Sequence, residues 1–385
     1  MTLITSTYEL EAAIRTLRMS PFVTVDSEFI RETTFWPELC LIQLASADLA
    51  VLIDPKAKGL DLRAFFDLMA DENIVKVFHA ARQDIEIIHH LAGIIPAPLF
   101  DTQIAAAVCG YGEAISYDQI VQRLIGHRLD KSSRFTNWGQ RPLSEKQMAY
   151  ALADVTHLCD VYTNLKNELS ERGREEWLLE EIAPLLSVDT YAPPIEDAWK
   201  RVKGRVKKPR ELAILQQVAA WRERIAKERN LPRGRVLKDE VLIEIAIQQP
   251  KDGAALAQLR GLSQGFERSE GAHSLLEAIK EGFKTDLATL PPIQKFQPRS
   301  ESLSAAIDLL RVLLKAVADE HHIAPKIIAT TDDLEKIVKG EGLAEVPAMR
   351  SWRYSMFGEK AQKMLSGKIY FYFEGGKILI KEHCK

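Results

Sequence analysis

Cysteine is scarce in this sequence, and the few cysteines are far apart. Cys40, Cys109, Cys159 and Cys384 are separated by 69, 50 and 225 residues. This spacing fits neither the close pairs of a zinc site nor the density of a disulfide-stabilised domain. We therefore expect ordinary buried thiols in a reducing compartment, the cytoplasm.

Long hydrophobic runs and several common motifs are also lacking. No apolar run approaches the roughly 18 residues that a membrane helix needs, and the first residues lack the basic and then apolar pattern of a secretion signal. No membrane partner is therefore expected. The motifs GxGxxG, GxxxxGKS/T and GxSxG do not occur, which argues against dinucleotide-binding, P-loop and serine-hydrolase functions. The composition, 46% hydrophobic and 27% charged, is that of a globular protein.

The charge of the chain is nearly balanced overall but unevenly distributed. The net charge is −3 over 385 residues, a length that predicts two or three domains. Residues 1–190 hold 28 acidic and 17 basic residues, whereas residues 200–238 hold 14 basic and 3 acidic ones. Such a basic segment can bind an anionic partner, or it can be a linker and a helix face exposed to solvent. The sequence leaves both interpretations open.

The first 170 or so residues are predicted to form a mixed α/β domain, because strand and helix periods alternate there. Short polar stretches separate the first three strands, which favours an antiparallel meander. Ser144 and Gln147 form a capping box at the start of a long helix. Strands are expected at 22–29, 39–45, 48–54, 74–80 and 98–100, and helices near 62–69, 81–93, 101–110, 116–126 and 144–169.

The rest of the chain is predicted to be mainly helical. Several prolines between residues 171 and 209 mark a connector, and residues 287–300 form a second linker. Alternation around Gly375 and Gly376 predicts a terminal β-hairpin. Helices are expected near 210–229, 238–248, 254–260, 272–282 and 303–322.

Two carboxylates share one side of an otherwise apolar strand. Asp26 and Glu28 are two residues apart in VDSEF, so both point to the same face, and Ser27 points to the other. Adjacent carboxylates repel each other and lose hydration unless a cation lies between them. The alternative is an edge strand with one face in water, which an isolated DxE pattern fits better.

Two helical segments place further acids beside apolar stripes. Asp84 lies one turn before Ile87 and Ile88, so its carboxylate is expected at the buried start of a helix. The alternative is a surface acid that favours the helix dipole. Tyr150 and Asp154 are four residues apart on the long helix and lie one above the other. If this pair is considered without the other acids, the better interpretation is a core tyrosine beside a surface acid.

Together, the four carboxylates suit a pair of hard divalent cations. Mg²⁺ and Mn²⁺ prefer oxygen ligands and complete their coordination with substrate phosphate. Two such ions about 4 Å apart can hold the attacking and leaving oxygens of a phosphodiester. Tyr150 could then orient the attacking water, since its ordinary pKa of about 10 is too high for efficient base catalysis.

The motifs VDSEF, HAARQD and YALAD resemble the three exonuclease motifs of the DEDD superfamily, the last in the form of its tyrosine subclass. The ribonuclease D branch is similar in particular, through FIRETTFWPELCLIQLAS, FDTQIAA and LDKSSRFTNWGQRPLSEKQMAYALADV. The stretch beginning RELAILQQVAAWRERIAKERN, with LAQLRGLSQGF, resembles the HRDC module of that family. The resemblance covers residues 20 to about 283, and the order of the motifs is more specific than any one motif.

The resemblance implies an RNase H-like α/β exonuclease domain, with a mixed sheet and flanking helices, followed by two mainly helical HRDC-like modules. The terminal hairpin departs from an all-helical second module. The expected boundaries are 1–170 for the exonuclease domain, 171–206 for a connector, 207–284 for the HRDC domain, 285–300 for a linker and 301–385 for the second HRDC-like domain.

The resemblance also implies the activity: metal-dependent 3′→5′ hydrolysis of structured RNA, such as tRNA precursors, with release of 5′-mononucleotides. Two divalent ions, Mg²⁺ or Mn²⁺ with Zn²⁺ or Co²⁺ as alternatives in vitro, would be the cofactors. Tyr150 would position the attacking water. The metal ligands would be Asp26, Glu28, Asp84 and Asp154.

Further residues are candidates for substrate binding. Aromatic and amide groups after the first motif could contact the terminal base, and basic groups could hold phosphates. Each also has an ordinary explanation in core packing, a satisfied core histidine or a solvated loop charge. The candidates are Phe35, Trp36, Gln43, His79, Lys131, Arg134, Arg141, Lys203, Arg205, Lys207 and Lys208.

Two other functions remain open. A DNA 3′→5′ exonuclease would use the same carboxylates, because they do not contact the sugar 2′-position that distinguishes RNA. A non-catalytic RNA-binding protein would have lost at least one of the five motif residues, and none is lost. The family resemblance, together with the absence of a coiled-coil heptad, favours a monomer.

Overall fold

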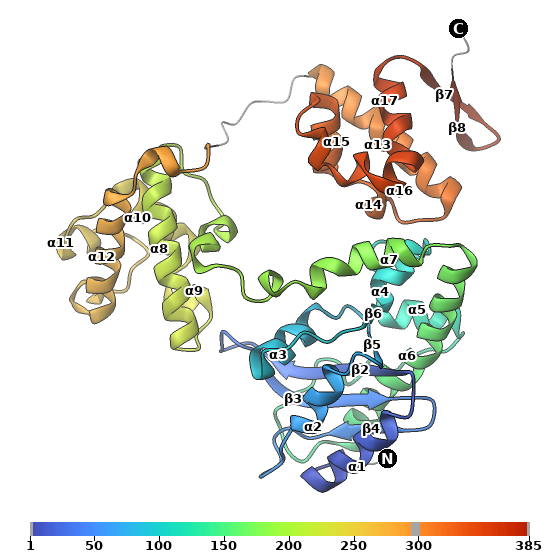
Figure 1. The fold of residues 1–385 in the computed structure, drawn as a ribbon. Helices are drawn as coiled ribbons and strands as arrows, with labels where there is room; N and C mark the ends of the chain where they lie inside the picture. Colours follow the sequence, from blue (N-terminus) through green and yellow to red (C-terminus); the bar gives the residue numbers. More distant parts are fainter. Residues whose placement is uncertain (1–2, 294–300, 383–385) are drawn as a thin grey trace.

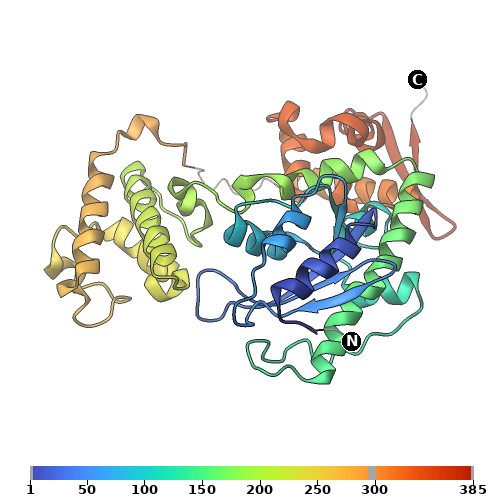
Figure 2. The same ribbon diagram turned by 60° about the horizontal axis from the view of Figure 1, so that its bottom comes forward.

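A computed structural model describes residues 3–293 and 301–382. Three bodies follow one another along the chain (Figure 1). Each body has a hydrophobic core of its own. The last body lies against the first, while the middle one extends to one side (Figure 2).

The first body is built on a six-stranded mixed sheet in the order β1-β4-β3-β2-β5-β6. The predicted meander is confirmed: β2 (Phe22–Ile30) pairs antiparallel with β3 (Glu38–Ala45), and β3 with β4 (Ala50–Ile53). β5 (Val75–Phe78) and β6 (Leu99–Asp101) continue the sheet parallel to β2. Because β2 lies inside the sheet, the edge-strand explanation of its two carboxylates is wrong.

The first elements of the chain were not predicted from the sequence. β1 (Leu3–Ile4) pairs parallel with β4, and α1 (Thr7–Leu17) follows it. Ser6 and Glu9 form the capping box of α1, whose stripe of buried leucine and isoleucine side chains packs into the core of the sheet. A two-residue strand is too short to show a period, so its pairing could not be foreseen.

The predicted helices of the first body are all present. They are α2 (Arg63–Met69), α3 (Arg82–Ala92), α4 (Thr102–Val108), α5 (Tyr117–Leu124) and α6 (Glu145–Glu171). The capping box at the start of α6 is confirmed. α6 crosses the sheet in contact with β2, β3, β4 and β5, and so it brings its own side chains over the carboxylates of β2.

The first part of the predicted connector packs against the first body. It contains α7 (Glu175–Ile182), and Leu178, Ile182 and Tyr191 belong to the core of the first body. Ala198 and Val202 already belong to the core of the second body. Short 3-10 turns occupy Ala183–Leu186, Val188–Thr190 and Ile195–Arg201.

The second body is helical, as predicted. Its helices are α8 (Pro209–Glu228), α9 (Arg233–Val236), α10 (Asp239–Gln248), α11 (Gly253–Leu256) and α12 (Glu270–Lys284), with 3-10 turns at Phe266–Arg268 and Leu287–Thr289. Of the predicted second linker, residues 294–300 lie outside the described residues.

The third body is also mainly helical, and the predicted terminal hairpin is confirmed in β7 (Ile369–Glu374) and β8 (Lys377–Glu382). Trp352 stacks on Trp177 of α7 with ring centroids 4.1 Å apart. Its other elements are α13 (Glu301–His321), α14 (Pro325–Ile328), α15 (Thr331–Lys339), α16 (Ser351–Arg353) and α17 (Glu359–Leu365), with 3-10 turns at Leu343–Glu345 and Pro347–Met349 and a π turn at Tyr354–Gly358.

The described cysteines are free thiols. Cys40 and Cys109 are buried and Cys159 is partly buried, whereas Cys384 lies outside the described residues. Within residues 3–293 and 301–382, no helix combines the length and the apolar character that crossing a bilayer requires.

Candidate active site

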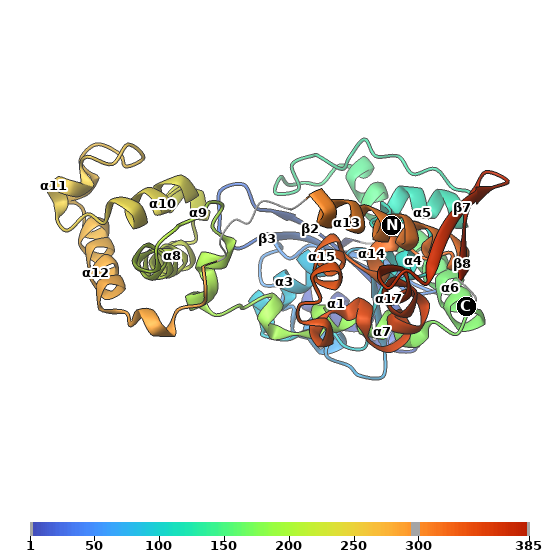
Figure 3. The same ribbon diagram turned by 90° about the horizontal axis from the view of Figure 1, so that it is seen from above.

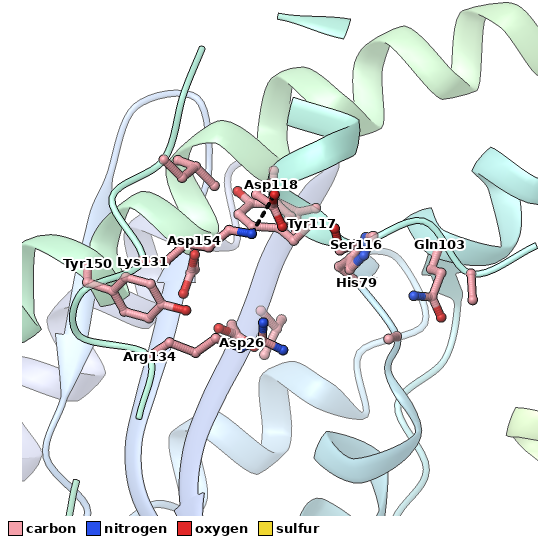
Figure 4. Close-up of a pocket in the computed structure, with 15 residues that line it drawn as sticks. Asp26, His79, Gln103, Ser116, Tyr117, Asp118, Lys131, Arg134, Tyr150 and Asp154 are labelled. Carbon is pink, nitrogen blue, oxygen red and sulfur yellow. Dashed lines mark ion pairs between the residues drawn. The ribbon is translucent and has the colours of Figure 1, made fainter. Parts of the chain in front are cut away.

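Three carboxylates from two elements meet over the middle of the sheet. Asp26 and Glu28 project from β2, and Asp154 projects from α6 where that helix crosses the strand. One oxygen of each carboxylate lies within 4.8 Å of one oxygen of the other two. Tyr150, one turn before Asp154, points its hydroxyl group towards the same space (Figure 4). The structure therefore brings these four predicted residues together.

The fourth predicted carboxylate stands beside this cluster. Asp84 lies in the first turn of α3 and is 8% exposed. Ser27 donates a hydrogen bond of 2.5 Å from its hydroxyl oxygen to Asp84 Oδ1. This contact was not predicted, because alternation alone places Ser27 on the face away from Asp26 and Glu28. It joins the start of α3 to the strand that carries the other acids.

Burial and mutual repulsion make the charged forms of these acids unfavourable in the metal-free protein. Burial, together with Asp84, Asp154 and Glu28, raises the pKa of Asp26 well above its ordinary range. Burial and the neighbouring acids raise the pKa of Glu28 to about 9, although Arg134 opposes the shift. Burial also raises the pKa values of Asp84 and Asp154 to about 7.

The donor set fits hard divalent cations. It offers carboxylate oxygens only, on two rigid elements, with too little positive charge nearby to offset them. Cations placed between such groups relieve the repulsion and favour the ionised forms. The carboxylate cluster thus suits divalent metal ions.

Two tyrosines beside the acids keep their protons. Burial, and then the negative charge of Asp154, raises the pKa of Tyr150 above its ordinary value. A hydrogen bond joins these two side chains and opposes the rise in the pKa of Asp154. Tyr117, at the start of α5, donates from its hydroxyl to the carbonyl of Ala153 at 3.1 Å, and burial raises its pKa as well.

A cavity of about 330 Å³ opens next to the carboxylates. Asp26, Tyr150 and Asp154 line it together with three predicted substrate-binding residues, His79, Lys131 and Arg134; Arg134 and Lys131 lie beside the acids, and His79 lies farther away (Figure 4). The two ring nitrogens of His79 lie 3.0 and 3.1 Å from Thr102 Oγ1 and the Ile115 carbonyl. Lys131 pairs with Asp118 at 2.6 Å.

Two predicted aromatic residues do not reach this cavity. Phe35 is buried under the guanidinium group of Arg233, 4.5 Å from its ring centroid. Trp36 stacks on His90 with centroids 4.0 Å apart. Both rings lie between the first and second bodies, so the structure does not place them for stacking on a terminal base in the cavity.

Two further polar candidates lie elsewhere. Arg141 is held by two hydrogen bonds to Asp54, at 2.8 and 2.7 Å, and does not line the cavity. Gln43 faces Asp26 across the β2–β3 pair and is fully buried. Neither atom of its amide group has a hydrogen-bond partner among the described residues.

The predicted cations of the basic segment are exposed at the start of the second body. None of them lines the cavity beside the carboxylates. They are Lys203, Arg205, Lys207 and Lys208.

Several residues of the site escaped the sequence analysis. Gln103, Ser116 and Tyr117 line the cavity, and Ala80 does so in a left-handed conformation with φ of 62°. The S-x-x-Q capping box at Ser116 was a usable signal for the start of α5. No local pattern indicates that this helix start faces the carboxylates, since that depends on how α5 packs.

Comparisons with known proteins identify two domains and the relatives of the chain. Residues 1–170 match a family model described as a 3′-5′ exonuclease, and residues 211–279 match that of the HRDC domain. Ribonuclease D of Bartonella henselae is 61% identical over 382 residues, which cover 99% of this chain and 94% of that protein. Ribonuclease D of Nitrobacter hamburgensis is 50% identical over 380 residues, covering 98% and 99%.

A solved structure extends the likeness to the whole fold. The crystal structure of Escherichia coli RNase D matches with a TM-score of 0.80 and 28% identity, over 95% of this chain and 98% of that one. That protein is described as an exoribonuclease involved in structured RNA processing. Identity of this extent to the curated relatives, over nearly the full chain, shows that the chain belongs to the ribonuclease D family of 3′-5′ exoribonucleases.

Proposed function

We propose that this exoribonuclease removes 5′-mononucleotides one at a time from the 3′ ends of structured RNA, such as tRNA precursors. The observation that carries the proposal is the meeting of Asp26, Glu28 and Asp154 within 4.8 Å on an interior strand and a crossing helix. The description of the E. coli relative as an enzyme of structured RNA processing supports the substrate class.

Asp26, Glu28, Asp84 and Asp154 would hold two divalent cations, Mg²⁺ or Mn²⁺. Bound there, such ions supply a water of lowered pKa and offset the charge of the phosphate. The raised pKa values of the acids support this role, because groups that repel one another in the free protein gain most from a cation.

Tyr150 would orient the attacking water without removing its proton. Its pKa is raised, so the hydroxyl group stays protonated at neutral pH, and its hydrogen bond with Asp154 fixes its direction. Arg134 would contact the substrate phosphate, since it lines the cavity close to Glu28 and Asp154. Lys131 lines the same cavity and could contribute once released from Asp118.

The cavity beside the acids would receive the terminal nucleotide. Its volume of about 330 Å³ falls in the range of small-ligand sites. Gln103, which lines the cavity as well, donates a hydrogen bond from its side-chain amide to the carbonyl of Ile115 (Figure 4). His79 has both nitrogens in contact with protein groups, so its role there is to shape the wall.

Digestion of a 3′-labelled RNA with Mg²⁺ or Mn²⁺ tests the proposal. Asp26→Asn and Asp154→Asn should each abolish the release of labelled mononucleotide, whereas the exposed Asp48→Asn serves as the matched control. Degradation at the wild-type rate by either active-site variant would show that the assignment is wrong.

The same assay separates the alternatives. A DNA exonuclease would release nucleotides from a DNA strand of the same sequence at least as fast as from RNA. A non-catalytic RNA-binding protein would hold the RNA without shortening it. We also infer that the protein is a cytoplasmic monomer, and light scattering of the purified chain checks the oligomeric state.

The exposed cations at 203–208 would bind RNA backbone away from the site of hydrolysis. Neutralising Lys203, Arg205, Lys207 and Lys208 together should weaken RNA binding and flatten its salt dependence. Hydrolysis of a mononucleotide model ester should stay unchanged. Equal loss on both substrates would point to misfolding of the second body instead.

A further inference from the structure

A second cavity lies between the exonuclease body and the second body. It measures about 330 Å³, and none of the four acids of the active site lines it. Its walls come from the loop 31–37 after β2, the first turns of α3, the connector, and the helices α8 and α9. In Figures 1 and 3, α3 and this loop face α9 across the gap between the two bodies. We refer to it as the interdomain groove.

Specific contacts hold the two sides of the interdomain groove together. The side-chain oxygen of Asn230 accepts hydrogen bonds from the backbone N–H groups of Phe35, at 3.1 Å, and Trp36, at 3.0 Å. Arg233 covers the ring of Phe35, 4.5 Å from its centroid. The groove is therefore formed before any ligand binds.

The lining of the groove carries an excess of positive charge. Five cationic side chains face two carboxylates. Arg31 is paired with Glu86 through two bonds of 2.7 and 2.8 Å. Glu223 accepts two bonds from Arg233, at 2.6 and 2.7 Å, and a third from Arg201 at 3.1 Å. Both carboxylates are thus hydrogen-bonded to arginines, and five cations against two acids leave the lining with a net positive charge.

Two cations of the lining are not in direct ion pairs, although the charge of Lys227 helps to lower the pKa of Glu223. Within the part of the chain that the structure describes, Arg82 and Lys227 form no ion pair. Arg82 is exposed at the first position of α3, and Lys227 is partly buried on α8. They come from the two bodies and face one groove, an arrangement suited to an anionic chain that passes between them.

Two aromatic rings of the groove, those of Phe35 and Trp36, already have partners. Trp36 has His90 stacked on its ring at 4.0 Å and the ammonium group of Lys227 6.0 Å from its centroid. Phe35 lies under Arg233. Because both rings already have partners, the cations without an ion pair are the groups best placed to meet an RNA strand, through its phosphates. Such a site reads backbone and not sequence.

The groove lies next to the active site along the chain. Arg31 follows Glu28 by three residues and lies just after the end of β2, at most about 10 Å along the chain. Arg82 precedes Asp84 by two residues on the same helix. The groove and the acids Asp26, Glu28 and Asp84 are thus built on the same two elements, β2 with the loop after it and α3.

We propose that the interdomain groove binds the phosphates of the RNA strand on the 5′ side of the scissile bond, with Arg82 and Lys227 as its free cations. This rests on the proposed function, and it assigns the strand to a path that the exposed cations at 203–208 do not line. The site should be indifferent to base sequence and sensitive to salt.

The test uses the full chain with oligoribonucleotides from a dinucleotide to an octanucleotide. Arg82→Ala with Lys227→Ala should lower kcat/KM for the octanucleotide on the order of tenfold. The slope of log affinity against log salt should fall by about 1.4, since each single-strand phosphate contact contributes about 0.7. The dinucleotide, too short to reach the groove, should react within about twofold of the wild-type rate.

Two control variants complete the experiment. Arg15→Ala with Lys58→Ala removes two exposed cations that do not line the groove, and it should leave the length dependence unchanged. Arg82→Lys with Lys227→Arg keeps the charges and should restore turnover of the octanucleotide.

Three results would overturn the proposal. The first is a double-alanine variant whose kcat/KM depends on RNA length as in the wild-type protein. The second is a double-alanine variant that loses kcat/KM equally on the dinucleotide and the octanucleotide. The third is a variant that loses only inhibition by a 5′-mononucleotide, which would make the groove a product site. A wild-type protein inactive on every RNA would instead refute the proposed function itself.

Discussion

Replacing Asp154 by asparagine should stabilise the metal-free protein while abolishing hydrolysis. Burial raises the pKa of Asp154 to about 7 from an ordinary value of 3.8. Between these values the folded state binds a proton that the unfolded state has released, so the free energy of unfolding falls as the pH rises. Above pH 7 the ionisation of Asp154 lowers the free energy of unfolding no further. An asparagine at this position does not ionise, so it causes no such loss of stability.

The size of the effect follows from the shift. From pH 5 to pH 7 the wild-type protein should lose up to about 1.4 kcal/mol per pH unit through this group, roughly 3 kcal/mol in all. Asp154 is partly exposed, and solvent screening reduces this to about 2 kcal/mol. The stability advantage of Asp154→Asn should therefore be about 2 kcal/mol larger at pH 8 than at pH 5.

Urea unfolding in EDTA at pH 5 and pH 8 measures this difference, with the exposed Asp48→Asn as the matched control. Adding Mn²⁺ at pH 8 should raise the midpoint of the wild-type protein more than that of Asp154→Asn, because a ligand of the folded state stabilises it by mass action. An advantage that is equal at both pH values would refute the reasoning, since the cluster would then not carry the raised pKa values.

Three further predictions concern single side chains. Gln43→Met should raise the free energy of unfolding by about 1 kcal/mol, because it removes a buried amide without a partner; a lower urea midpoint would show that the amide is satisfied. Tyr150→Phe should lower kcat about tenfold to a hundredfold with little change in KM, since it removes the hydroxyl group that orients water; unchanged steady-state kinetics would exclude that role. Arg353→Ala should expose the junction between the third body and α7 to limited proteolysis, because Arg353 is the ion-pair partner of Glu180, at 2.6 Å, and of Glu181; wild-type resistance would show that packing alone holds the junction.

Much of the fold could be predicted because its signals are local. The strand period around Asp26, the capping box at Ser144 and the glycine pair of the hairpin each depend on neighbours in the sequence, and each appears in the structure. The two-residue strand β1 has no such signal, and it was missed. The packing of α7 on the first body was missed as well, since a run of prolines around it indicates only where regular structure ends.

Only part of the site could be predicted, because only some of its contacts depend on neighbours in the sequence. Spacing by two on a strand and by four on a helix places Asp26 with Glu28, and Tyr150 above Asp154, from the sequence alone. The contact of Ser27 with Asp84 depends on how α3 approaches the strand. Trp36 illustrates the opposite case, in which a plausible base-stacking residue is covered by His90 and Lys227.

The sequence by itself determined the chemistry of this protein: the kinds of ligand atoms, their spacing within each element, and the resemblance of the motifs to an exoribonuclease family. Only the tertiary structure decided which elements meet. In the tertiary structure, β2 lies in the interior of the sheet and α6 crosses it. A positively charged groove lies between two bodies. The physical reason is that periodicity and capping act over a few residues, whereas burial, repulsion between acids and uncompensated charge depend on groups that are distant in the chain.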